Sequence, residues 1–401
     1  MRRAIVLILA VLFIVQTSNS AFADEIDEVP AECDLKFDGD LANQSVKFQT
    51  DLGPRIPGSV ASSMLRESIK DNLTGWHITE STHHSEGWTL TNLYATWNKG
   101  MGSNVMFAAH YDSRYKADRE ENESLRDQPI DGANDGASGV AVLLELARII
   151  PQMNLTHEVT LFFTDTEDQG DDYFTYVLGA RAWADNLTEE EADSIESFIL
   201  VDMVGDADLT LSKTTPGNDT LWNRTENIIR NLDDVCGLYD DSYFDFENVE
   251  YVLDDHDPAH KLGIPAIDII DGRYGEGAEF LGGEIWHTLN DTADKVSAES
   301  LQTVGYILES GLISGSWLNV RVEAEQVIDS DNDGIEDSLD TCPDIPGTEE
   351  NGCPIEEEKS SDEDEKSDDE EEVVGILLML CIIFVWGNFA WIFIADNRGE
   401  G

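Results

Sequence analysis

Short apolar runs alternate with amphipathic segments through the middle of the chain. Runs rich in β-branched and aromatic residues predict buried strands at residues 105–109, 159–164, 198–204 and 264–270. Less continuous patterns predict two further strands, at residues 76–80 and 88–97. Helical spacing of apolar positions predicts helices at residues 60–73, 138–150, 221–232 and 297–318. This alternation predicts an α/β fold with a mostly parallel central sheet that helices cover on both faces.

Both ends of the chain carry apolar runs of another kind. Arg2 and Arg3 precede an apolar run and a small-x-small site at residues 21–23, which predicts a signal peptide over residues 1–23. Residues 373–395 contain no charge and are long enough for one transmembrane helix. The chain is therefore expected to be exported and anchored at the cell surface by this helix, with its main domain outside. Residues 396–401 would form a short cytoplasmic tail.

The composition changes at both borders of the main domain. Residues 24–44 are polar and predict an irregular N-terminal arm, so the main domain is expected at residues 45–322. Residues 327–354 space their carboxylates as a calcium loop does, and Gly334 permits its sharp bend. The predicted calcium ligands are Asp329, Asp331, Asp333, Ile335, Asp337 and Asp340. The stretch DSDNDGIEDSLDTCPD also resembles a type 3 thrombospondin repeat; an acidic linker with chance spacing is the alternative. Residues 355–372 predict a disordered acidic stalk.

The charge of the chain limits its possible binding partners, and its cysteine content bears on the cellular compartment. The chain carries 83 Asp and Glu against 24 Lys and Arg, which argues against nucleic acid as a partner. Four of the five cysteines lie outside the predicted span, where disulfides are permitted in an exported protein. Cys342 and Cys353 are the favoured pair because they are close in sequence. Cys33 and Cys236 would be the remaining pair.

Histidine and carboxylate side chains stand at or just after the ends of predicted strands. His110 and Asp112 follow the strand at residues 105–109, and Asp135 lies in a Gly-rich turn before a predicted helix. Glu167 and Asp168 follow the strand at residues 159–164; further candidates are Asp202, Asp254, Asp255, His256 and His287. Open α/β sheets bind ligands at the carboxyl ends of their strands. Two histidines and three carboxylates gathered there would suit a divalent metal, above all zinc.

Six motifs in order resemble the zinc aminopeptidase and glutaminyl-peptide cyclotransferase superfamily. They are HYDS (110–113), GANDGASG (132–139), TEDQG (166–170), DMVG (202–205), DDH (254–256) and WHTLNDTADKV (286–296). The resemblance implies a zinc-exopeptidase fold, with Glu167 as general acid and base. It implies zinc ligands at His110, Asp135, Asp168, Asp202 and His287. Asp135 would bridge when two zincs bind, and position 168 is Glu in many relatives.

The resemblance leaves two activities on peptide and protein N-termini open. A glutaminyl cyclase would hold one zinc at Asp135, Asp168 and His287 and turn an N-terminal glutamine into pyroglutamate with release of ammonia. A zinc aminopeptidase would hydrolyse the N-terminal peptide bond at a two-zinc site. The motifs GPRIPGS and HYDSRY, Asp255 as a second catalytic residue and Trp286 as a substrate contact favour the cyclase, which is our interpretation. The motifs DGASG and DMVG favour the aminopeptidase.

A non-catalytic cell-surface binding module is a third hypothesis, from a different class of function. The predicted calcium repeat, stalk and anchor would suit such a module. Its catalytic residues would be free to change, so the presence of Glu167 argues against it.

Overall fold

The computed structural model describes residues 33–321 except residues 173, 239–242 and 276. Its centre is a six-stranded sheet with the strand order β1-β2-β4-β3-β5-β8. The strands are β1 (His77–Ser85), β2 (Trp88–Trp97), β3 (Asn104–His110), β4 (Glu158–Thr164), β5 (Ile195–Asp202) and β8 (Ala266–Ile270). β4, β3, β5 and β8 are mutually parallel, whereas β1 and β2 pair antiparallel. The predicted mixed α/β class is therefore confirmed.

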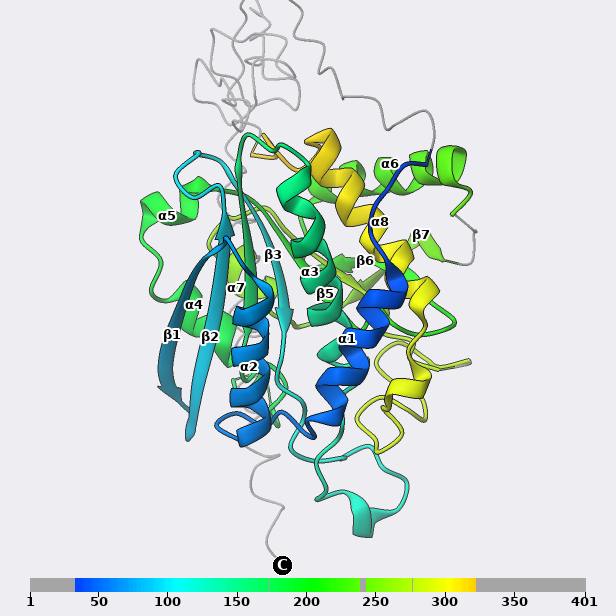
Figure 1. Cartoon of the computed structure of the whole chain (residues 1–401). Helices are drawn as coiled ribbons and strands as arrows, with labels where there is room; N and C mark the ends of the chain where they lie inside the picture. The colour runs from blue at the N-terminus through cyan, green and yellow to red at the C-terminus, as the bar shows by residue number, and fades with distance from the viewer. Residues whose placement is uncertain (1–32, 173, 239–242, 276, 322–401) are drawn as a thin grey trace, which may run out of the picture. The chain divides into compact units, whose positions relative to one another are not determined.

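Helices cover both faces of this sheet. The near face in Figure 1 carries α1 (Gly39–Asp51), α2 (Val60–Asn72), α3 (Ala137–Ile149) and α8 (Ala298–Ser314). The far face carries α4 (Leu178–Ala184), α5 (Glu189–Ser194) and α7 (His256–Lys261). α6 (Asp219–Cys236) packs on α8, beside a small parallel sheet of β6 (Leu211–Thr215) and β7 (Phe244–Tyr251). Three short 3₁₀ helices are η1 (Glu123–Leu125), η2 (Ile150–Gln152) and η3 (Ala293–Lys295).

The central strands are apolar throughout because both of their faces are buried. In β3, Val105 and Phe107 join the core beneath α3 and α8, whereas Met106 and Ala108 join the core on the opposite face. Alternating side chains of a strand point to opposite faces, so a strand between two helical layers has no polar side. This double burial explains why an unbroken apolar run predicted β3 correctly.

The expectation of an irregular arm over residues 24–44 was wrong from residue 39 onwards, where α1 begins. Asp38 caps this helix by accepting a hydrogen bond from the backbone N–H of Leu41. α1 buries Gly39, Ala42, Val46 and Gln49, of which Ala42 and Val46 join the core with α3 and α8. Leu41 and Phe48 are apolar but exposed, so the apolar positions of α1 do not form one buried face, and tertiary packing rather than sequence periodicity stabilises the helix.

Several predictions concern residues that the structure does not describe. These are the signal peptide (1–23), the calcium loop and its ligands, the stalk, the span at residues 373–395 and the Cys342–Cys353 pair. Within residues 33–321, no helix is long and apolar enough to cross a membrane. Cys33 and Cys236, expected only as the remaining pair, do form a disulfide, which ties the start of the described chain to the end of α6.

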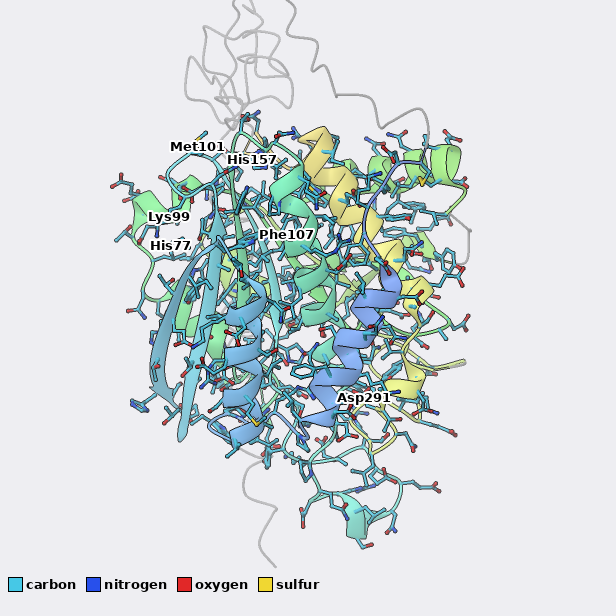
Figure 2. All side chains as sticks on the ribbon, in the orientation of Figure 1. His77, Lys99, Met101, Phe107, His157 and Asp291 are labelled. Atoms are coloured by element: carbon cyan, nitrogen blue, oxygen red, sulfur yellow. A yellow bond between two sulfur atoms is a disulfide. The ribbon has the colours of Figure 1, made fainter. Side chains whose placement is uncertain are left out.

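Residues labelled in Figure 2 mark the two ends of the central strands. Figure 2 shows Met101 and His157 near the amino end of β3, and Asp291 beyond its carboxyl end. The carboxyl end is where Asp291 accepts hydrogen bonds from the backbone N–H groups of Asn134 and Asp135, at 2.8 and 3.2 Å. The candidate site lies at this end of the sheet.

Candidate metal centre and adjoining pocket

Strand ends and one tight turn bring the predicted ligands together. His110 is the last residue of β3 and Asp202 the last residue of β5. Asp135 precedes α3 in a turn where Gly136 has a φ of +98°. A Cβ added at Gly136 would lie 2.6 Å from the carbonyl oxygen of Asp112. Only glycine fits this turn, which holds Asp135 against the end of β3.

Five buried side chains form two triads that share Asp135. In the first triad, Nε2 of His110 lies 3.2 Å from Oδ1 of Asp135 and 3.1 Å from Oδ1 of Asp202. In the second, Nε2 of His287 lies 3.5 Å from Oδ2 of Asp135 and 3.3 Å from Oδ1 of Asp168. The structure thus brings together all five residues that the sequence proposed as metal ligands. The Asp135 carboxylate directs one oxygen towards each histidine.

The electrostatics of these groups fit a bound cation. Burial raises the pKa of Asp168, and the nearby charge of Asp135 raises it further, against the opposite effect of His287. Burial by itself would lower the pKa of His110, but the charge of Asp202 raises that pKa well above its usual value. Oδ2 of Asp168 is buried without a hydrogen-bond partner among the residues described. Buried carboxylates and imidazoles this close together suit a divalent metal that binds nitrogen and oxygen ligands, and zinc is such a metal.

Glu167 lies beside the triads without belonging to either. Its side chain is 8% exposed and lines the pocket in front of Asp135, Asp168 and Asp202. Burial raises the pKa of Glu167 well above its usual value, and the charge of Asp254 adds to this effect. A carboxyl group whose pKa is raised in this way can both accept and return a proton near neutral pH.

Asp254 and Asp255 point in different directions. Asp254 lines the pocket. Asp255 is fully buried, and its carboxylate accepts a hydrogen bond from the hydroxyl of Thr164 at the end of β4. Burial raises the pKa of Asp255 to about 7. The sequence singled out Asp255 for catalysis, whereas the structure places its neighbour Asp254 in the pocket wall.

The pocket combines an acidic floor with apolar walls. Its volume is about 370 Å³, and its apolar wall includes Met203, Ile270, Leu281 and Trp286. The ring of Trp286 lies 3.9 Å from that of His287, centroid to centroid. A small uncharged side chain could lie against this wall while a cationic group faces the carboxylates. Trp286 thus occupies a position that suits the substrate contact proposed from sequence.

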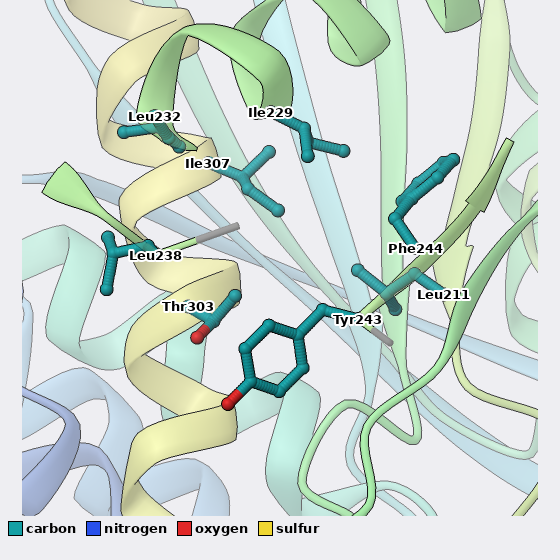
Figure 3. Close-up of a pocket in the computed structure, with 8 residues that line it drawn as sticks. All are labelled: Leu211, Ile229, Leu232, Leu238, Tyr243, Phe244, Thr303 and Ile307. Atoms are coloured by element: carbon teal, nitrogen blue, oxygen red, sulfur yellow. The ribbon is translucent and has the colours of Figure 1, made fainter. Parts of the chain in front are cut away.

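Figure 3 shows a second, smaller pocket, lined by residues of α6, α8 and the small sheet. Its lining is aliphatic and aromatic, with the hydroxyl groups of Thr303 and Tyr243, and includes Leu211, Ile229, Leu232, Leu238, Phe244 and Ile307. The described residues of the lining include no histidine, carboxylate, lysine or arginine side chain. The chemistry is therefore sought in the pocket at the strand ends.

Sequence reasoning missed several residues that support the site. Arg114 and Asp118 contact the second triad, and Asp291 and Tyr274 hold the turn that carries Asp135. Their importance depends on contacts between distant segments, which spacing along the chain does not reveal. Arg114 lies in the stretch HYDSRY, and the scarcity of basic residues, 24 in the whole chain, could also have drawn attention to it.

Comparisons with known proteins agree with this geometry. Residues 92–310 match the profile of peptidase family M28. The glutaminyl-peptide cyclotransferase of Bothrops jararaca is 26% identical in an alignment of 307 positions, and the match covers 67% of this chain and 80% of that protein. The solved glutaminyl cyclase of Porphyromonas gingivalis is 30% identical with a TM-score of 0.61, covering 68% of this chain and 96% of its own. A Zn-dependent exopeptidase from Parabacteroides distasonis is 27% identical with a TM-score of 0.61, covering 71% and 99%.

Proposed function

Because the chain belongs to peptidase family M28, we propose that it is a zinc-dependent enzyme that converts the N-terminal glutamine of peptides and proteins to pyroglutamate. The similarity to glutaminyl cyclases over two thirds of the chain supports this reaction. The observation that carries the proposal is the buried carboxyl group of Glu167, which faces the same pocket as both triads.

We assign the zinc to Asp135, Asp168 and His287, with His110 and Asp202 able to hold a second ion. Bound zinc supplies a Lewis acid that polarises the γ-carbonyl group of the substrate glutamine. The apolar wall at Trp286 would hold the glutamine side chain, while the surrounding carboxylates attract the α-amino group. This orientation brings the α-nitrogen close to the γ-carbon, with which it forms the lactam bond.

Glu167 would move the proton that this reaction requires. As the α-nitrogen bonds to the γ-carbon, Glu167 accepts a proton from that nitrogen. It returns the proton to the amide nitrogen as the bond from this nitrogen to the γ-carbon breaks, and ammonia leaves. Asp254 and Asp255 assist through their charges, since both raise the pKa of Glu167. In this proposal Asp255 acts from behind the pocket and does not touch the substrate.

A zinc aminopeptidase is the second candidate, favoured by one specific feature. The two triads are both complete, and Asp135 directs one carboxylate oxygen to each. Two-metal hydrolases need such a bridging ligand. In this alternative, Glu167 would accept a proton from the attacking water and return it to the departing amine, so that the N-terminal peptide bond is hydrolysed.

One assay of the purified protein separates the candidates. A glutamine-initiated peptide and an aminoacyl anilide are each incubated with the protein, and its zinc-to-protein ratio is measured. Ammonia release with one zinc supports the cyclase, whereas release of the aromatic amine with two zincs supports the aminopeptidase. A protein that binds no zinc and converts neither compound would overturn both and favour the non-catalytic binding module.

The proposal includes the ends of the chain, where it is based on sequence patterns alone. The enzyme would be exported by residues 1–23 and anchored by residues 373–395, with the catalytic domain outside the cell. A calcium ion would stabilise the loop at residues 329–340 between domain and anchor. Calcium binding by a peptide of residues 327–354 would test the last point.

A further inference from the structure

The chain between β3 and α3 forms a long loop beyond the carboxyl ends of the strands (Figure 1). One part of it, residues 114–120, packs against the distant segment that carries His287. The backbone N–H of Arg119 donates a hydrogen bond to the carbonyl oxygen of His287 at 3.2 Å. Glu120 accepts one from the backbone N–H of Leu289 at 3.2 Å, and the Arg119 guanidinium lies 4.6 Å from the Trp286 ring. Residues 114–120 therefore support the whole Trp286–Leu289 turn.

His287 needs this support because of its backbone conformation. Its φ is +55°, in the left-handed region that residues other than glycine seldom adopt. Such a conformation is strained and persists only where surrounding contacts hold it. The hydrogen bond from Arg119 to the carbonyl oxygen of His287 is one of these contacts.

Asp118 lies at the nitrogen of His287 that faces away from the triad. Its Oδ1 is 3.4 Å from Nδ1 of His287. A proton on Nδ1, attracted by this carboxylate, leaves the lone pair on Nε2, which faces Asp135 and Asp168. A carboxylate in this position orients a metal-binding histidine and increases its basicity.

Arg114 connects Asp118 to the second triad. It is buried, and its Nε and Nη2 each donate to one oxygen of Asp118 at 2.8 Å. Its Nη1 donates to Oδ1 of Asp168 at 2.7 Å and to the carbonyl oxygen of Asp168 at 3.0 Å. Nη2 also donates to the carbonyl oxygen of Gly170 at 3.0 Å. These five hydrogen bonds equal the five N–H donors of a guanidinium group, which lysine could not replace.

The histidine of the first triad also has a carboxylate near its outer nitrogen, but backbone N–H groups and not an arginine hold this carboxylate. Nδ1 of His110 lies 3.6 Å from Oδ1 of Asp112 and has no hydrogen-bond partner in the described part of the chain. The Asp112 carboxylate instead accepts from the backbone N–H groups of Glu167 and Asp168 and from the side chain of Gln169. The two triads are therefore supported unequally.

We propose that Arg114 and Asp118 are positioning residues that hold His287 and Asp168 in the geometry of a metal site, so that the second triad takes the first zinc ion. The inference rests on the zinc role of the proposed function, but not on which of the two reactions the enzyme performs. Arg114 fixes one ligand directly and the other through Asp118.

Zinc affinity of the full-length protein tests this inference. Zinc-free wild type, Asp118→Ala, Asp118→Asn and Arg114→Lys are titrated with zinc in competition with a chelating indicator. Loss of such a supporting partner typically weakens metal binding about 10- to 100-fold. Asp118→Ala should weaken the first zinc by this factor and Asp118→Asn by less, because the asparagine oxygen can still accept from Nδ1. Arg114→Lys should also weaken it, since three donors replace five.

Asp127→Asn is the matched control, because Asp127 is an exposed acid of the same loop. It should leave zinc affinity within about twofold of wild type, as removal of one exposed charge has little effect. The thermal midpoint of each zinc-free variant is measured in parallel and should stay near that of wild type. If a variant binds zinc more weakly and its zinc-free form also unfolds at a clearly lower temperature than zinc-free wild type, the residue has a merely structural role and the inference is overturned.

The zinc affinity of the wild-type protein distinguishes a failure of this inference from a failure of the proposed function. Tight zinc binding by wild type that Asp118→Ala leaves unchanged would overturn the positioning role alone. A wild-type protein without affinity for zinc would overturn the proposed function, and the positioning role with it.

Discussion

The carboxylate of Asp112 accepts a hydrogen bond from the backbone N–H of Glu167 at 3.1 Å. The residue two positions after His110 thereby holds the start of the segment that carries the proposed acid–base group. The same carboxylate accepts from the backbone N–H of Asp168 at 3.2 Å. One buried side chain beyond β3 thus sets the relative positions of a proposed metal ligand and the proposed proton carrier.

Asp112→Asn should impair turnover more than zinc binding. The backbone N–H groups of Glu167 and Asp168 each donate to a different oxygen of Asp112, and the amide nitrogen of asparagine would replace one of these two acceptors, so residues 167 and 168 would shift. We expect kcat to fall about 10- to 100-fold, the usual effect of losing a supporting partner, with the first zinc retained. Steady-state kinetics and metal analysis of the purified variant measure both quantities. Wild-type kcat in this variant would show that Asp112 does not position Glu167.

Asp135→Ala should remove metal together with activity, because Asp135 belongs to both triads. His110→Ala is the matched comparison, since it damages the first triad and leaves Asp135, Asp168 and His287 in place. We expect the zinc-to-protein ratio to approach zero in Asp135→Ala and to keep at least one zinc in His110→Ala. Unchanged metal content in Asp135→Ala would contradict the assignment of ligands.

Asp271 should make the stability of the protein decrease as pH rises. It follows β8, is fully buried, and accepts from the backbone N–H groups of Thr210 and Arg273. Burial raises its pKa to about 7 in the folded protein, against about 3.9 when unfolded. At pH values between these two pKa values, the folded state binds a proton at Asp271 more often than the unfolded state does. The stability that this group contributes is therefore fully present at low pH. It is lost as pH rises through about 7, at roughly 1.4 kcal/mol per pH unit.

The variant Asp271→Asn isolates this contribution because asparagine does not titrate. The free energy of unfolding is measured with urea at pH 5 and pH 8 for both proteins. Wild type should lose more stability over this interval than Asp271→Asn does. Equal losses would mean that the Asp271 carboxyl group is not held neutral by burial.

Sequence patterns predicted the elements whose residues are buried on both sides. The run at residues 105–109 corresponds to β3, and the run at residues 159–164 to β4. Short elements were missed: α4 and α7 have seven and six residues and depend on packing against the core that contains Phe162 and Ala259. β1 was predicted too short because its second half is polar and contains no apolar residue, as an edge strand can be.

The candidate site was predictable where a residue type and a strand end coincided. His110 and Asp202 were found in this way, because the end of a buried strand predicts where its side chains gather. Asp254 and Asp255 show the limit of this reasoning. Neighbouring residues point in different directions, and the sequence cannot tell which one faces the pocket. The supporting role of Arg114 could not be predicted from the sequence, because its five hydrogen bonds include partners more than 50 residues away along the chain.

In the proposed reaction, Glu167 moves the proton while neighbouring side chains hold the metal. Glu167→Gln preserves the size of the side chain and removes its ability to accept a proton, and Glu167 belongs to neither triad. The decisive measurement is ammonia release from a glutamine-initiated peptide by Glu167→Gln, with its zinc content determined on the same sample. We predict a loss of activity of more than about 10²-fold with zinc bound as in wild type. Activity near that of wild type in the zinc-loaded variant would contradict the account.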